Sequence, residues 1–224
     1  YHGWSDQLVY SLHIPYTKTF EAHGIPKEVS ENTSEFFPGD VAGLRKVLEE
    51  NEKAGGTAAV IIEPFGPESG TRPVAKDFAA KVRELCDEFH TLLIFDEVVT
   101  AFRVGPGGAQ GYFNVKPDLT VFGKIVAGGY PMAGGVGGSE EIMSCIAAGV
   151  KAGKKKAYVG GTLTANPLSC AAGYFAIDEI IRQDAAMKAG ENGDKLCDGI
   201  QKLIDKYELP FVTWNTGSIV HFEV

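Results

Sequence analysis

Two continuous apolar segments stand on either side of an amphipathic segment in the first half of the chain. Residues 57–64 (TAAVIIEP) and 91–97 (TLLIFDE) are apolar without alternation, which is typical of strands covered on both faces. Between them, apolar residues recur at helical spacing over about residues 74–89. Strand, helix and strand in this order predict a βαβ unit, with a parallel sheet and a right-handed crossover.

The rest of the chain carries further patterns of the same kinds. Helices are predicted over residues 38–53, with Asp40 as N-cap, and over 165–183, with Pro167 near the first position; the helical pattern continues through 195–207. Strands are predicted over residues 117–124, over 130–138 running into a helix that Ser139 caps, and as an antiparallel pair over 211–224. Residues 1–38 lack periodicity and predict a long loop with a short strand or two.

Charged residues follow three of the predicted strands at the point where each strand ends. Glu63 and Asp96 end the two apolar strands, and Lys124 follows the next one, just before Gly128 and Gly129. The carboxyl ends of parallel strands form the edge at which open α/β sheets bind ligands. A lysine at such an edge is costly to desolvate unless it has a partner or a lowered pKa, and a lowered pKa makes an amine nucleophilic.

Taken singly, these residues have ordinary interpretations, because Lys124 could be a surface lysine and Asp96 could cap a turn. Together, on one glycine-lined crevice, they suit a cofactor that has a cationic ring nitrogen and an aldehyde, which is pyridoxal 5'-phosphate. The aspartate would keep the ring nitrogen protonated. The lysine would hold the aldehyde as a Schiff base and later move the proton.

Composition narrows the class of protein. With 224 residues, 44% of them hydrophobic, the chain is long enough for one substantial α/β domain or for one domain and part of another. A net charge of −8 argues against nucleic acid or an anionic membrane as partner, and no apolar run is long enough to span a bilayer. The 4 cysteines are widely separated, which is typical of a reduced, cytoplasmic protein. The histidines show no metal-ligand spacing, so no metal is predicted.

The two ends of the sequence carry no signals of their own. The start, YHGWSDQLVY, has no basic region or small-residue cleavage site of a signal peptide. The end, GSIVHFEV, stops inside a strand-like alternation. We therefore expect the chain to be the middle of a longer protein.

Three motifs follow one another along the chain: IFDEVVTAFR, GAQGYFNVKPDLTVFGKIVAGGYPMAGGVGG and GGTLTANPLSCAAG. They resemble motifs of the class III pyridoxal-phosphate aminotransferases, in the branch near glutamate-1-semialdehyde aminomutase and the ω-transaminases. The resemblance spans residues 1 to about 180. It implies the type I aminotransferase fold, in which helices sandwich a mostly parallel sheet, and an obligate homodimer. Residues 1–180 would be the large cofactor-binding domain without its N-terminal part, and residues 181–224 the beginning of a small α+β C-terminal domain.

The resemblance also implies roles for residues around the cofactor. Lys124 resembles the Schiff-base lysine, and Asp96 the partner of the pyridine nitrogen. Tyr1 of YHG matches the aromatic residue that stacks on the ring, and Val98 of DEV the apolar residue on the other face. A flat π-system is held well between an aromatic and an aliphatic side chain.

Three more positions belong to the same expected site. Thr162 of GGT matches the threonine that reaches the cofactor phosphate of the neighbouring subunit, so the two subunits would share their active sites. Glu63 of IIEP matches a glutamate on the substrate side. His2 adjoins the stacking residue and is a candidate for cofactor binding, although packing under the loop would explain it equally well.

Four functions stay open at the level of sequence. An aminotransferase acts on small amine and keto substrates, whereas an aminomutase moves the amine within one molecule. Both need Lys124 and Asp96, and the apolar Val99, where many relatives have glutamine, favours the aminomutase branch. A dinucleotide-binding domain would explain the 28 glycines, but GPGGAQG and GGVGGSE both miss the GxGxxG spacing. A non-catalytic protein of the same fold has no need of Lys124.

Overall fold

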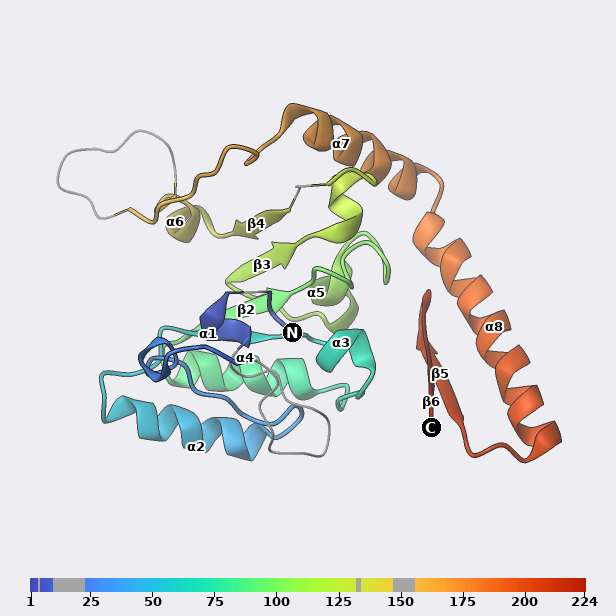
Figure 1. The fold of residues 1–224 in the computed structure, drawn as a ribbon, viewed down its shortest axis with the longest axis horizontal. Coiled ribbons are helices and arrows are strands. Elements are labelled where there is room, and N and C mark those ends of the chain that lie inside the picture. Colours follow the sequence, from blue (N-terminus) through green and yellow to red (C-terminus); the bar gives the residue numbers. More distant parts are fainter. Residues whose placement is uncertain (4, 10–22, 132–133, 147–155) are drawn as a thin grey trace.

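A computed structural model describes residues 1–3, 5–9, 23–131, 134–146 and 156–224 of the chain (Figure 1). Its central sheet has the strand order β1-β2-β3-β4, with bounds Ala59–Ile62, Leu92–Asp96, Leu119–Phe122 and Gly135–Gly138. The first three strands are parallel and β4 is antiparallel to β3. The predicted α/β fold with a mostly parallel sheet is therefore confirmed.

The main hydrophobic core lies between the sheet and the two helices that cover one of its faces (Figure 1). These helices are α2 (Val41–Glu52) and α4 (Phe78–Glu88). The N–H of Gly43 donates to Asp40 Oδ1 at 2.8 Å, which confirms the predicted N-cap of α2. One cluster of buried side chains joins the helices to the strands. The helices contribute Leu44, Leu48, Phe78, Val82 and Leu85, and the strands contribute Val60, Ile62, Leu93 and Phe95.

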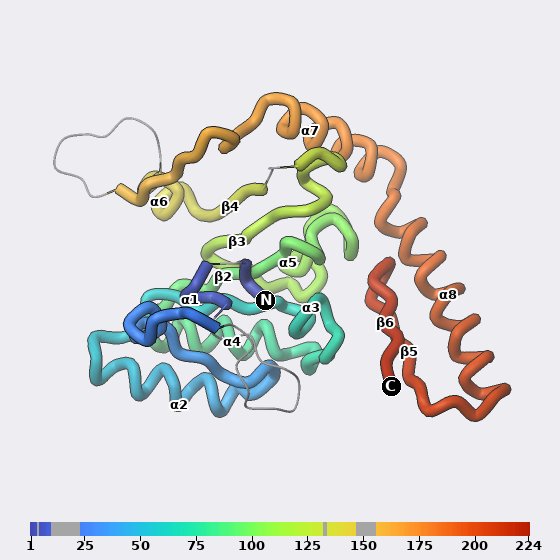
Figure 2. Tube along the Cα trace, viewed as in Figure 1, coloured from blue at the N-terminus to red at the C-terminus, as the bar shows by residue number. Residues whose placement is uncertain are grey.

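The C-terminal part of the chain leaves the sheet through two helices and ends in a hairpin. These elements are α7 (Pro167–Arg182), α8 (Ala185–Tyr207), β5 (Val212–Thr216) and β6 (Ile219–Glu223). The two strands are antiparallel, as predicted, and Figure 2 shows them lying along α8. Glycine in α8 permits this close packing, because a Cβ at Gly193 would collide with the carbonyl oxygen of Gly217 in the hairpin turn.

Four details differ from the sequence-based expectations. Helix α4 begins at Phe78 and not near residue 74, because residues 75–78 form a turn closed by the N–H of Phe78 and the carbonyl of Ala75. The helical pattern over residues 165–207 is broken into α7 and α8, because Asp184 between them has a left-handed backbone (φ +51°). The loop after β1 contains a short turn, α3 (Pro67–Gly70), whose residues Glu68 and Ser69 are left-handed.

The fourth difference concerns the predicted loop over residues 1–38. Its described residues form no strand and instead contain two short helical turns, α1 (Asp6–Val9) and η1 (Lys27–Val29). Residues 10–22 lie outside the described part. Among the described residues no helix is both long enough and apolar enough to cross a membrane.

Candidate active site

Asp96 is the last residue of β2, and its carboxylate is held from two sides. Its side chain is buried, with 8% of the residue exposed. The backbone N–H of Val98 donates to Oδ1 at 3.1 Å in an Asx turn. On the other oxygen, Oδ2 lies 2.8 Å from Nδ1 of His2, 94 residues away in the sequence. His2 therefore contacts the key carboxylate directly, a role for which the sequence alone gave no more support than for simple packing.

Glu63 lies beside Asp96, because β1 and β2 are paired in parallel register with Ile62 opposite Phe95. The N–H of Glu68 donates to Oε1 of Glu63 at 3.1 Å, and the N–H of Ser69 donates to Oε2 at 2.9 Å. The backbone nitrogen of Tyr1 lies 3.0 Å from the same Oε1. Residues 1 and 2 thus connect the ends of β1 and β2, and they bring Tyr1 to the predicted edge.

Lys124 follows β3 at the same edge of the sheet and begins a short helical turn, η2 (Lys124–Ala127). Its side chain is exposed. Its backbone has φ +50°, in the left-handed region that a lysine seldom adopts. The residue before it is glycine for a steric reason, since a Cβ on Gly123 would lie 2.9 Å from Cγ1 of Val98. Val98 therefore packs beside the turn that presents Lys124.

Helix α7 holds the chain that follows Lys124. A Cβ on Gly173 would collide with the carbonyl oxygen of Val126, so only glycine permits this approach of α7 to η2. Ser169 Oγ donates to the carbonyl oxygen of Pro131 at 2.7 Å. These contacts explain why small residues stand at positions 169 and 173 of the motif GGTLTANPLSCAAG.

The structure thus brings most of the predicted site residues together at the carboxyl ends of β1, β2 and β3: Tyr1, His2, Glu63, Asp96, Val98 and Lys124. Thr162 is different. It is exposed, in the segment that connects α6 (Glu140–Met143) to α7 (Figure 1).

Glu97 is a functional candidate that the sequence analysis missed. It is fully buried, and successive side chains of an extended chain point to opposite sides, so it faces away from Asp96. Oε2 accepts a hydrogen bond from the N–H of Ala109 at 2.5 Å and one from Thr100 Oγ1 at 3.2 Å. Oε1 has no partner among the described residues. The signal in the sequence was the second of two successive carboxylates after an apolar strand.

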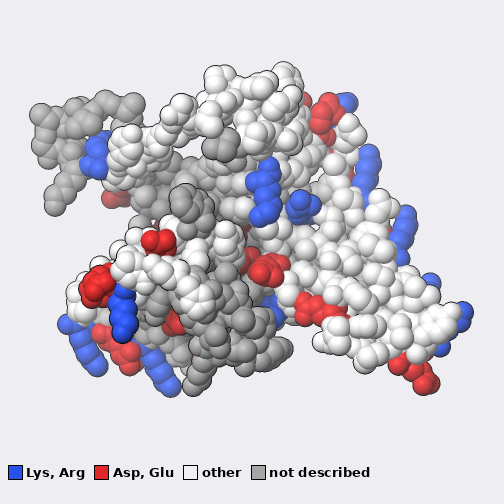
Figure 3. All heavy atoms as spheres, viewed as in Figure 1, with Lys and Arg blue, Asp and Glu red and all other residues white. Residues whose placement is uncertain are grey.

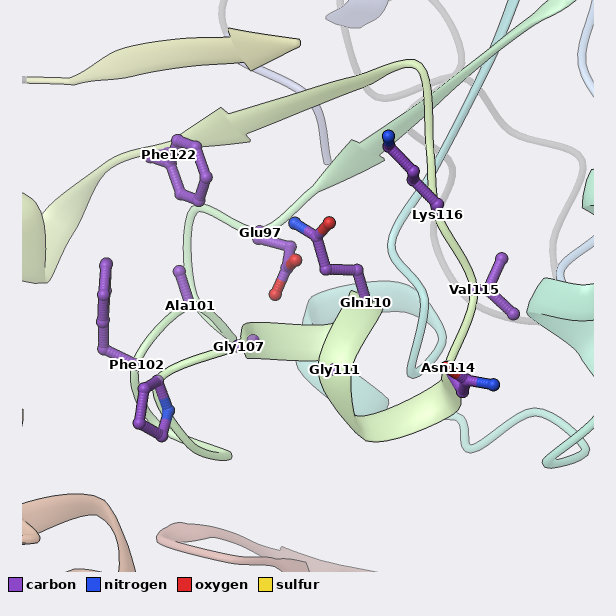
Figure 4. A pocket seen from close by; sticks show the side chains of 12 residues that line it. Glu97, Ala101, Phe102, Gly107, Gln110, Gly111, Asn114, Val115, Lys116 and Phe122 are labelled. Carbon is purple, nitrogen blue, oxygen red and sulfur yellow. The ribbon is translucent and has the colours of Figure 1, made fainter. Parts of the chain in front are cut away.

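Glu97 lines a cavity of about 480 Å³ beside α5 (Gly108–Phe113). Figure 4 shows its carboxyl group pointing toward the start of α5, with Phe102, Gln110 and Phe122 also around the space. Burial raises the pKa of Glu97, and the charge of Asp96 adds to this, whereas the donors from Ala109 and Thr100 oppose it. Asp96 and the two residues that contact it, His2 and Val98, do not line this cavity.

We expect Glu97→Gln to flatten the dependence of stability on pH. Because the folded state raises the pKa of Glu97, the folded protein binds this proton more tightly than the unfolded chain does. Stability is therefore greatest below the ordinary pKa of glutamate and falls as the pH rises through the folded-state value. Glutamine keeps an acceptor for Ala109 and has no proton to lose. Denaturant unfolding at a series of pH values measures the effect.

Two variants control this measurement. Glu97→Ala also has a flat pH dependence but leaves the N–H of Ala109 without its acceptor, so it should be about 1–3 kcal/mol less stable than Glu97→Gln at every pH. Glu49→Gln removes an exposed carboxylate of α2 and measures the effect of losing one negative charge at the surface. An unchanged slope in Glu97→Gln would show that this carboxyl group does not titrate differently in the folded protein.

Asp118 is a carboxylate with a structural role at the opposite edge of the sheet, just before β3 begins. Its Oδ2 accepts hydrogen bonds from the N–H of Leu93 and from Arg83 Nη1, both at 2.7 Å. Burial alone would raise the pKa of Asp118, but the Leu93 N–H and the Arg83 guanidinium outweigh it and hold that pKa below its usual range. Asp118 thus joins α4, β2 and the start of β3.

A mostly parallel sheet with a buried aspartate, a glutamate and a strained lysine at its carboxyl edge is typical of α/β proteins that bind a ligand at that edge. The sequence profile described as "Aminotransferase class-III" matches residues 15–224. The chain therefore belongs to the class III aminotransferase family.

Individual relatives agree with this placement. A glutamate-1-semialdehyde 2,1-aminomutase of Legionella pneumophila (strain Paris) is 37% identical over 230 residues, which are 99% of this chain and 50% of that protein. An omega-transaminase from Sphaerobacter thermophilus superposes with a TM-score of 0.85 at 30% identity, over 100% of this chain and 51% of that one. A glutamate-1-semialdehyde-aminomutase from Pseudomonas aeruginosa PAO1, in complex with PMP, superposes with a TM-score of 0.81 at 28% identity. The superposition covers 99% of this chain and 49% of that one. The chain spans about half the length of the curated relatives it matches.

Proposed function

We propose that the full-length protein is a pyridoxal-phosphate-dependent aminotransferase. It would move an amino group between an amine or amino acid and a keto or aldehyde acceptor. The observation that carries this proposal is the pairing of two features at one sheet edge: a buried Asp96 held by His2, and an exposed Lys124 in a left-handed conformation. The class III aminotransferase family, to which the chain belongs, links both features to the transfer of amino groups.

The residues at this edge fit the cofactor. Asp96 accepts one hydrogen bond from Val98 and contacts His2, and a carboxylate can accept more, so it has capacity left for a protonated ring nitrogen. Val98 and Tyr1 would cover the two faces of the ring. Lys124 Nζ would carry the cofactor as a Schiff base. When bound, the cofactor supplies an electron sink for the negative charge that develops on the substrate carbon.

The chain's own residues would then perform three tasks. Lys124 Nζ would take a proton from the substrate carbon and return it to the neighbouring position, as a general base and then as a general acid. Asp96 would keep its negative charge beside the ring nitrogen, with His2 orienting it. Glu63 would face the substrate, in an orientation that the N–H groups of Glu68 and Ser69 support.

An intramolecular amino transfer of the glutamate-1-semialdehyde aminomutase type is the second candidate. Two observations favour it. Val99 is apolar where many relatives have glutamine, and the curated relatives at 37% identity are aminomutases. Both candidates use Lys124 and Asp96 in the same roles.

We further propose that the enzyme is a homodimer whose subunits share their active sites. The exposed Thr162 would reach the cofactor phosphate of the partner subunit. Large apolar side chains are exposed near it and along α7, including Leu163, Leu168, Tyr174 and Phe175. Figure 3 shows that the surface over the middle of α7 is almost free of charged side chains. An uncharged apolar surface of this kind is typical of a subunit interface.

The domain division and the cellular location are proposals as well. Residues 1–180 would form the large cofactor-binding domain and residues 181–224 the beginning of the small one. The change from the sheet to α8 and its hairpin supports this division. The free thiols of all four cysteines support a reducing, cytoplasmic location.

The visible absorption spectrum of the full-length protein with pyridoxal phosphate tests the proposed function. We expect a yellow absorption band that bleaches when an amine donor is added and returns when a keto acid is added. A band that bleaches only with an amino-aldehyde, and recovers without a second substrate, would establish the aminomutase instead. A folded protein that shows no such band with added cofactor would refute both candidates.

A further inference from the structure

The C-terminal hairpin contacts the loop that supports Glu63. Trp214 Nε1 of β5 donates to the carbonyl oxygen of Gly70 at 3.1 Å, and His221 Nε2 of β6 lies 3.2 Å from the carbonyl oxygen of Ser69. Because a carbonyl oxygen can only accept, this ring nitrogen of His221 carries a proton. Trp214 and His221 are opposite each other in the hairpin, and their rings stack with centroids 5.2 Å apart.

The contacted loop has an unfavourable backbone that needs external support. Glu68 has φ +49° and Ser69 has φ +63°, so two successive residues other than glycine are left-handed. Each such residue costs of the order of 1 kcal/mol or more and persists only when its surroundings hold it. This conformation aims the N–H groups of Glu68 and Ser69 at the carboxylate of Glu63.

The loop therefore connects Glu63 to the hairpin through its own peptide groups. The N–H of Ser69 donates to Glu63 Oε2, and the carbonyl oxygen of the same residue faces His221. The hairpin is in turn attached to α8, since Asn215 Nδ2 donates to Asp194 Oδ1 of that helix at 2.7 Å. Figure 1 shows the hairpin between α8 and α3.

We propose that Trp214 and His221 are positioning residues that set the orientation of Glu63 through this loop. They do not touch substrate themselves. By holding the carbonyl oxygens of Ser69 and Gly70, they keep the two N–H groups directed at Glu63. The C-terminal hairpin thereby determines how the substrate side of the pocket presents its carboxylate. This inference rests on the substrate-side role of Glu63 in the proposed function.

Hydrogen exchange of the full-length protein tests the structural half of the proposal without any turnover. In Trp214→Phe and in His221→Phe, amides of residues 68–71 should exchange roughly 2-fold to 10-fold faster, as expected for the loss of one hydrogen bond. Phe222→Leu is the matched control. Phe222 lies next to His221 on the opposite face of β6 and contacts Phe211, so its replacement should leave this exchange unchanged. Unchanged exchange in both variants would overturn the proposal.

A double-mutant cycle tests the functional half. Trp214→Phe and Glu63→Gln should each raise the KM for the amine donor, the former roughly 2-fold to 10-fold, with little change in kcat. The double variant should be no worse than Glu63→Gln, because Trp214 acts only through Glu63. If the KM increases of the two single variants multiplied in the double variant, the inference would be overturned. A Glu63→Gln variant with the wild-type KM would overturn it as well. A wild-type protein without a cofactor band would instead refute the proposed function, and the exchange experiment would still decide whether the hairpin holds the loop.

Discussion

Asp96→Asn is expected to lower kcat/KM of the full-length protein by about 100-fold to 1,000-fold while the fold stays intact, a loss typical of removing one preorganised electrostatic partner. The substitution changes charge with almost no change of shape. Asparagine can still accept the hydrogen bond from the N–H of Val98 through its oxygen. Its amide nitrogen would face His2, whose Nδ1 can act as an acceptor in the appropriate tautomer.

What asparagine cannot do is hold a proton on the ring nitrogen of the cofactor. A neutral amide has no charge to stabilise a pyridinium, so the ring would withdraw electrons poorly from the substrate carbon. The loss should therefore appear in kcat. Steady-state kinetics with a saturating donor would measure it, and the absorption band of the cofactor should persist because Lys124 is unchanged.

Asp118→Asn is the matched control for Asp96→Asn. Both aspartates adjoin strands and accept backbone N–H groups, but Asp118 lies at the opposite edge of the sheet and pairs with Arg83. Its replacement should lower the unfolding temperature and leave kcat near the wild-type value. If Asp96→Asn kept near-normal turnover, or if Asp118→Asn lost as much, the assignment of Asp96 to the ring nitrogen would be wrong.

The carboxyl-edge residues could be predicted from the sequence because they depend on local patterns and one rule of topology. Glu63 and Asp96 each end an uninterrupted apolar strand, and parallel strands bring their ends to one edge. Lys124 follows the third strand of the same sheet. Nothing beyond strand order was needed to place these three residues together. The particular roles of the neighbouring residues came from the family resemblance, not from the pattern.

Other features depend on how distant segments meet, and no local pattern records that. His2 and Asp96 are 94 residues apart, and Trp214 and Gly70 are 144 apart. The left-handed conformations of Lys124, Glu68 and Ser69 contradict the backbone preferences of those residue types, so propensity argues against them. In each case tertiary contacts stabilise a local geometry that the segment alone would avoid. Such conflicts between local preference and final structure concentrate at functional sites.

Lys124→Asn is expected to abolish the yellow band and to lower kcat by about 10⁴-fold, the upper range of what a positioned proton donor and acceptor contributes. The fold should not suffer. Lys124 is exposed and has φ +50°, a backbone conformation that asparagine adopts more readily than lysine. The unfolding temperature of the cofactor-free variant should therefore equal or exceed that of the cofactor-free wild type. Reduced activity together with unreduced stability would show that Lys124 serves catalysis and does not stabilise the fold.

Lys116→Asn supplies the comparison for this experiment. Lys116 is also exposed and also adjoins β3, but it precedes the strand and so lies at the opposite edge of the sheet. Its loss should change neither the band nor kcat. Borohydride reduction of the wild-type holoenzyme should attach the cofactor irreversibly to the peptide that contains Lys124, and mass spectrometry would locate it. Attachment at another lysine would contradict the assignment of Lys124 as the covalent site, and so would a Lys124→Asn variant that keeps the band and its turnover. In either case the strained turn after β3 would have no chemical reason to carry a lysine.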